Sequence, residues 1–299
     1  MSDSLDTLRH KIRSAGDLAS VVRTMKALSA ASIVQYEHAM VSLRDYFHTV
    51  ELGMRVCLSQ RTPPPPGAGT GQASAAAVVF GTDQGLVGQF NDTLADFVVG
   101  KLSAKTPGVK IWAVGERVHG RLAESGLTLA DPIAGPASLA GVTRLAGSIL
   151  LEWDSYSTGK ENAELYLFHQ RLQAPSLCEP VMQRLLPLDS RWWGQFSDIS
   201  WPSSNLPEVS GPLPQTLGTL IREYLFVTIL KACVESLVAE NATRLNAMQR
   251  AEKNIGQLEE NLSREFYRLR QNAIDDELFD LIAGFDTVAS SNKAHSQIT

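Results

Sequence analysis

Apolar residues recur at alternating spacings of three and four along residues 213–288. No proline follows Pro214 in the chain, and glycine is sparse in this stretch. The repeat runs through Leu217, Leu220, Tyr224, Val227, Lys231, Val234, Val238, Asn241, Leu245, Met248, Glu252, Ile255, Glu259, Leu262, Phe266, Leu269 and Ala273. A 3.5-residue repeat held that long predicts one long helix with a coiled-coil seam. Such a helix would be roughly 100 Å long, so part of it must project and pair with another helix.

Polar residues interrupt this seam at Lys231, Asn241, Glu252 and Glu259. A polar seam residue can fix the register of a coiled coil at a cost in stability. So many of them indicate that the far half of the helix is not packed in a dry dimer interface. A plain dimeric coiled coil nevertheless stays open as an alternative at this point.

A second long helix is predicted over residues 1–59, because no proline occurs before Pro63. The same spacing passes through Leu5, Leu8, Ile12, Ala15, Ala19, Val22, Lys26, Ser29, Ile33, Tyr36, Met40, Leu43, Phe47 and Val50. Only Lys26 and Ser29 break it, within an interval of small residues that allows close approach from several sides. With a heptad helix at each end, the economical arrangement is an antiparallel coiled coil within the chain.

The pattern changes between the two helices. Residues 60–74 contain four consecutive prolines and then glycines, which predicts a linker that is stiff and then flexible. Short apolar strands are expected at 75–80, 110–114 and 165–169, and helices between them at 90–103, 117–125 and 139–156. An edge strand or loop is expected at 177–188, and an irregular connection at 192–214. Alternating strands and helices predict a Rossmann-like α/β domain over 75–212 with a mostly parallel sheet. Residues 289–299 are expected to form a flexible tail.

Composition limits the function further. The 299 residues carry a net charge of −5, so there is no general basic field for nucleic acid. No apolar run reaches the ~20 residues that span a bilayer, and the N-terminus has no signal-peptide core. The cysteines Cys57, Cys178 and Cys233 are far apart, which fits a reducing cytoplasm. The histidines show no metal-ligand spacing, so no metal site is expected. The acidic residues Glu116, Glu152 and Asp154 form no recognisable acid–base pair, so no catalytic residue is expected.

A glycine-rich turn is predicted at residues 81–88 (GTDQGLVG), after a strand and before a helix. Its spacing is neither that of a Walker A loop, which ends in GK[ST], nor that of the G-x-G-x-x-G dinucleotide fingerprint. We therefore expect the glycines to supply a tight turn and close strand–helix packing, with no bound cofactor. An enzyme that binds a nucleotide at this turn remains an alternative function for the chain.

Three blocks of sequence resemble the γ subunit of F-type ATP synthases. Residues 22–32 (VRTMKALSAAS) are similar to the family's ITKAM-x-MVAASK block, and residues 81–91 (GTDQGLVGQFN) to its SD-x-GLCGG-x-N turn. Residues 235–248 (ESLVAENATRLNAM), 270–274 (RQNAI) and 277–284 (ELFDLIAG) resemble the family's C-terminal motifs. The order and separation of the blocks match across nearly the whole chain.

The sequence departs from the family pattern at Ser32, Val87, Ala239, Leu245 and Asp275. These departures, with the proline-rich linker, suggest a divergent bacterial branch such as the alternative or sodium-linked ATPases.

The resemblance implies a non-catalytic rotor subunit that couples ion flow through a membrane ring to ATP synthesis or hydrolysis. Its implied partners are the α and β subunits of the catalytic hexamer, the ε subunit and the membrane c-ring, on the cytoplasmic face of the bacterial inner membrane. Matching positions imply partner contacts at Met25, Lys26, Arg270, Gln271 and Glu277. The alternative from the helical pattern alone is a dimeric coiled-coil adaptor with an α/β head.

Overall fold

The computed structural model describes residues 2–60, 74–102, 108–160, 163–174, 177–188, 190–196, 199–205 and 207–295. The predicted linker at 60–74 lies almost entirely outside these residues. The chain divides into two compact units. Unit 1 comprises Met1–Ala27 and Met248–Thr299, and unit 2 comprises Leu28–Ala247.

Two long helices contribute to both units. Helix α1 covers Ser2–Ser59 and helix α6 covers Leu213–His295. Every seam position predicted on the two helices is buried or half-buried, as a coiled-coil seam requires. The heptad pattern therefore identified the paired faces correctly along both helices.

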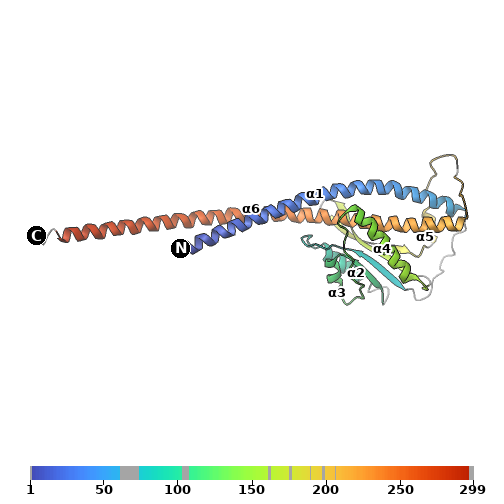
Figure 1. Ribbon diagram of the computed structural model, residues 1–299, viewed down its shortest axis with the longest axis horizontal. Coiled ribbons are helices and arrows are strands. Elements are labelled where there is room, and N and C mark those ends of the chain that lie inside the picture. The colour runs from blue at the N-terminus through green and yellow to red at the C-terminus, as the bar shows by residue number, and fades with distance from the viewer. Residues whose placement is uncertain are drawn as a thin grey trace. The chain divides into compact units, whose positions relative to one another are not determined.

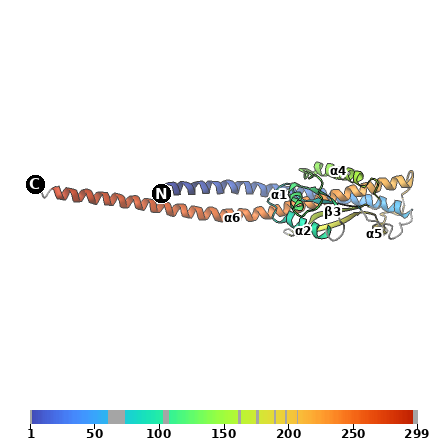
Figure 2. The ribbon, with the colours of Figure 1, turned by 90° about the horizontal axis from the view of Figure 1, so that it is seen from below.

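In unit 1 the two helices run antiparallel. Lys26 of α1 contacts Glu252 of α6, while Arg9, earlier in α1, lies against Phe266, later in α6. Both ribbon views show these segments side by side, with α6 continuing past the N-terminal end of α1 (Figures 1 and 2). The helix ends at His295, so the predicted tail is helical over 289–295, where no proline or glycine occurs.

Unit 2 contains a four-stranded sheet in the order β2-β1-β3-β4. The strands are β1 (Ala75–Phe80), β2 (Lys110–Val114), β3 (Glu164–Ala174) and β4 (Leu177–Leu186). Strand β1 pairs in parallel with β2 and β3, and β4 joins β3 in an antiparallel hairpin at the edge. The predicted mostly parallel sheet and its edge strand are thus confirmed.

Helices cover both faces of this sheet. They are α2 (Phe90–Leu102), α3 (Glu116–Ala123) and α4 (Leu139–Ser157), and a short helix α5 (Ser190–Gln195) follows β4. Alternate residues of β1 point to opposite faces: Ala77 and Val79 pack against α2 and α3, and Val78 and Phe80 against α4, α1 and α6. Unit 2 is therefore a three-layer α/β arrangement, as expected, whereas α5 falls in a stretch that we expected to be irregular.

The glycine-rich turn joins β1 to α2 and lies beside the turn between β2 and α3. Gly115 has φ 108°, and a Cβ there would lie 2.6 Å from the carbonyl carbon of Thr82. A Cβ at Gly81 would overlap Val118. The predicted role of the Gly81 turn in close strand–helix packing is confirmed.

Replacing Gly115 by alanine should destabilise the fold, because a side chain at positive φ is strained and meets the Thr82 backbone. We expect Gly115→Ala to lower the free energy of unfolding of the full chain by about 1–3 kcal/mol in urea denaturation. The matched control is Gly120→Ala in α3, where a Cβ meets nothing within 4 Å. That change should be neutral or stabilising by up to about 1 kcal/mol. Equal effects of the two changes would contradict the packing account.

Candidate functional site

The polar breaks in the two seams of unit 1 meet each other. Lys26 Nζ lies 2.6 Å from Glu252 Oε2, and Arg23 Nε lies 3.6 Å from the other carboxylate oxygen. The hydrogen bond from Lys26 lowers the pKa of Glu252. Lys26, a predicted partner contact, is therefore engaged within the chain, although its side chain keeps 34% of its surface exposed.

A second polar seam residue, Glu259 of α6, lies beside Gly16 of α1. A Cβ on Gly16 would lie 3.6 Å from a carboxylate oxygen of Glu259, which is an ordinary van der Waals distance. Unlike Glu252, which pairs with Lys26, Glu259 thus faces a position with no side chain in α1.

Met25, also predicted as a partner contact, belongs to a different face of α1. It is half-buried, and Leu18 and Val21 before it on the same face are 53% and 54% exposed. Spacings of three and four residues place all of them on one stripe of the helix. One stripe of α1 in unit 1 is therefore apolar, and it is exposed at Leu18 and Val21.

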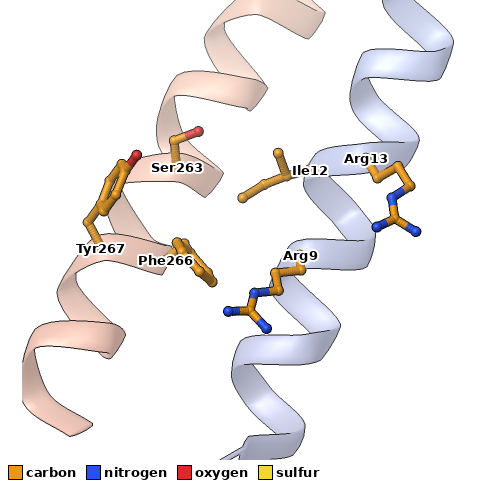
Figure 3. A pocket seen from close by; sticks show the side chains of 6 residues that line it. All are labelled: Arg9, Ile12, Arg13, Ser263, Phe266 and Tyr267. Atoms are coloured by element: carbon orange, nitrogen blue, oxygen red, sulfur yellow. The ribbon is translucent and has the colours of Figure 1, made fainter. Parts of the chain in front are cut away.

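A pocket of about 450 Å³ lies between the helices of unit 1, closer to the N-terminus (Figure 3). Ile12 and Phe266 point into the space between the helices, and the Arg9 guanidinium lies 5.4 Å from the Phe266 ring centroid. Arg9 also pairs with Asp6 at 3.2 Å, whereas Arg13 points away from α6. The pocket combines an apolar floor with exposed positive charge.

The remaining predicted contacts lie farther along α6. Arg270, Gln271 and Glu277 are all exposed, and Gln271 Nε2 donates to Asp275 Oδ1 at 3.3 Å. The rise of an α-helix puts Arg270 roughly 27 Å along the axis from Glu252. The predicted residues therefore lie in two separate regions of unit 1 and do not converge on one site.

The end of α6 carries an apolar surface that our sequence reasoning did not include. Its large side chains are 49–66% exposed. They are Ile274, Leu278, Phe279, Leu281 and Ile282. They follow Ala273, the last seam position, beyond the stretch that faces α1. The signal was present in the sequence, because Ile274, Leu278 and Leu281 keep a spacing of four and three that starts one residue after Ala273.

The Gly81 turn in unit 2 is filled by its own side chains. Asp83 accepts hydrogen bonds from the backbone amides of Glu116 at 3.0 Å and Gly135 at 2.7 Å. The Thr82 amide donates to Asn91 Oδ1 at 3.1 Å. These hydrogen bonds tie the turn to the start of α3, to the segment before α4 and to α2, which supports its structural role.

Among the residues that the structure describes, no group of three His, Cys, Asp or Glu side chains is arranged to hold a metal ion. No described helix combines the length and the apolar character needed to cross a membrane.

Comparison with known proteins identifies the family. A family model described as "ATP synthase" matches residues 4–288. The chain belongs to this ATP synthase family. The γ-subunit resemblance noted in the sequence is confirmed by curated relatives that are ATP synthase gamma chains. Those of Clostridium botulinum and Dechloromonas aromatica are each 24% identical, over 93% of this chain and 95% and 96% of their own lengths.

Solved structures of ATP synthases share the fold. The chain is similar to one in the OSCP/F1/c-ring structure of the Euglena gracilis mitochondrial ATP synthase, with a TM-score of 0.67 and 15% identity, covering 98% of this chain and 97% of that one. A chain in the central stalk/c-ring structure of the Tetrahymena thermophila mitochondrial ATP synthase gives a TM-score of 0.55 and 16% identity, covering 77% of this chain and 99% of that one. These likenesses confirm the predicted fold of long terminal helices with an α/β domain.

The Lys26–Glu252 contact predicts a pH dependence of stability. Because the folded state lowers the pKa of Glu252 from 4.5, the contact stabilises above that pH and is lost as the pH falls through the lowered pKa. We expect the melting temperature of the full chain, followed by circular dichroism, to fall across this window. Glu252→Gln should reduce the fall, and the control Glu260→Gln, in an exposed pair with Arg264, should not. Identical pH profiles for the two variants would refute the assignment.

Proposed function

We propose that this chain is the γ subunit of an F-type ATP synthase, the rotating central stalk that couples ion flow through a membrane ring to ATP synthesis or hydrolysis. The observation that carries the proposal is the exposed apolar end of α6, on a helix whose preceding residues are paired with α1. A contiguous exposed apolar surface is typical of an interaction site, so we expect a partner to cover it. Membership of the ATP synthase family supports the same conclusion.

The partners follow from the two units. The apolar end of α6 suits a sleeve formed by the α and β subunits of a catalytic hexamer, which can turn against a surface without fixed ion pairs. The basic side chains Arg9, Arg13 and Arg270 suit acidic loops of the same hexamer. The α/β unit is then available to the ε subunit and the membrane c-ring.

The subunit itself is not catalytic in this proposal. Its orientation biases each catalytic site of the hexamer toward an open or a closed state, which is a coupling free energy between ring and site. Met25, Lys26, Arg270, Gln271 and Glu277 are the proposed contacts through which that coupling passes. We place the complex on the cytoplasmic face of a bacterial inner membrane, in keeping with the bacterial gamma chains among its relatives.

Purification from the chain's own cells tests this proposal. A tagged copy isolated in mild detergent should bring down large α- and β-type subunits, with one copy per hexamer, and should hydrolyse ATP. Recovery of a bare homodimer without ATPase activity would refute the rotor and favour the coiled-coil adaptor. Binding of ATP to the isolated chain would instead favour an enzyme using the Gly81 turn.

Removing the exposed polar contacts on α6 should weaken coupling. We expect Arg270→Ala with Gln271→Ala to lower ATPase turnover of the reconstituted complex about five-fold or more, the lower range of allosteric coupling. Both side chains are exposed, so the change should not unfold the chain. Arg264→Ala is the matched control, since Arg264 already pairs with Glu260 at 3.5 Å on its own helix. Unchanged turnover in the double variant would exclude these two residues from the contact.

A further inference from the structure

A groove in unit 2 runs between α1 and β3, with α6 as its floor. It consists of two hollows of about 400 and 320 Å³ that share Glu37 and Leu172. The wall on α1 runs from Ile33 to Arg44, and the opposite wall is the end of β3, from Arg171 to Ala174. The floor is mostly apolar and consists of Glu235, Val238, Ala242 and Leu245.

The α1 wall exposes apolar surface beside this groove. Val41 lines the groove and is 57% exposed, and Val34, two helical turns earlier, is 54% exposed. Val34 and Val41 lie on one side of α1 with the exposed Glu37 between them, and Val41 adds apolar surface to the edge of the floor. Exposed apolar side chains beside an apolar groove with polar residues at its rim are typical of a surface that another protein covers.

The charges on the floor and the β3 wall neutralise each other. Glu235 lies 2.8 Å from His169 Nε2 and 3.0 Å from Arg171 Nε. Burial alone would raise the pKa of Glu235, but these two hydrogen bonds outweigh burial and lower it. Glu235 is therefore a carboxylate that holds Arg171 in place at the rim, and it offers little charge to a ligand.

The charges on the α1 wall remain available. Glu37 and Arg44 are exposed, and neither forms a hydrogen bond or an ion pair with another residue in the part of the chain that the structure describes. They lie seven residues apart, which is two helical turns or about 10.5 Å. An occupant of the groove thus meets a negative charge and, two turns farther on, a positive one.

We propose that this groove binds an amphipathic helix of another subunit of the same complex. The helix presents apolar residues at i, i+3 or i+4, and i+7 to the floor. It carries a basic residue opposite Glu37 and an acidic residue two turns away, opposite Arg44. From Ile33 to Arg44 the wall is roughly 16 Å long, so about three turns of the partner fit. The proposal depends on the proposed function only for the assembly in which the partner is sought.

Photo-crosslinking in the purified complex identifies the occupant. A benzophenone amino acid replaces Val41 in the tagged chain, and in a control it replaces Leu151, a similarly exposed apolar residue of α4 that does not line the groove. We expect the Val41 probe to give one main product with a segment of another subunit that has the stated apolar and charged spacing. The Leu151 probe should not capture that segment. Absence of a product at Val41, or a captured segment without this spacing, would overturn the proposal.

Charge reversal tests the register directly. The double variant Glu37→Lys, Arg44→Glu should lower the yield of the Val41 product at least about ten-fold, and reversing the two complementary charges on the captured segment should restore it. Because both side chains are exposed, the variant should melt as the parent chain does. Yield that is insensitive to the reversal would refute the charge pairing and with it the proposed helix.

The same preparation separates this proposal from the proposed function. Co-purification of hexamer subunits is scored before irradiation. If those subunits are absent, the rotor assignment fails, and the product formed at Val41 in whatever assembly is recovered still decides whether the groove binds such a helix.

Discussion

Antiparallel packing of α1 against α6 is the constraint on which the structure depends. A single heptad helix of this length cannot bury its apolar stripe alone, and here each helix supplies the other's missing surface. In unit 2 the same two helices also cover one face of the sheet, where Ile229 of α6 and Met54 of α1 are fully buried. The sheet core and the helix pair thus share residues, and neither can be removed without exposing the other.

Polar residues at the seam show how that constraint is met without a uniformly apolar interface. Glu252 has Lys26 across the seam in unit 1, and Glu259 lies over Gly16. In unit 2, Asn241 donates its side-chain amide to the Leu237 carbonyl of its own helix at 2.8 Å. Lys231 lies over the Phe47 ring, 5.4 Å from its centroid. Lys231, Asn241 and Glu252 each have a partner, and Glu259 faces a glycine, so polar residues are compatible with the seam within each unit.

Much of this architecture could be predicted because the pattern of apolar residues along the chain reflects which side chains are buried. Both seams follow from spacing, because burial on one face of a helix dictates residue type there. The strand at 75–80 follows instead from a continuous apolar run, and all six of its residues are buried. The pairing of Lys26 with Glu252 was missed because each seam was considered separately and register is a property of the pair. Short helix α5 has too few residues to show a period. The proposed contacts Arg270 and Glu277 cannot be predicted from the apolar pattern, because exposed side chains take no part in packing the chain.

The uninterrupted helix between Glu252 and Arg270 also limits how the chain can change in length. Each residue advances an α-helix by about 100° around its axis. One inserted residue there would turn Arg270 and the apolar end of α6 away from their present direction, while Glu252 stayed opposite Lys26. Only insertions close to a whole number of helical turns would keep Arg270 and the apolar end of α6 pointing in their present direction relative to Glu252. The number of residues between Glu252 and Arg270 therefore fixes the direction in which Arg270 points. We expect the length of this helical segment to vary far less than the length of the loops in the α/β unit.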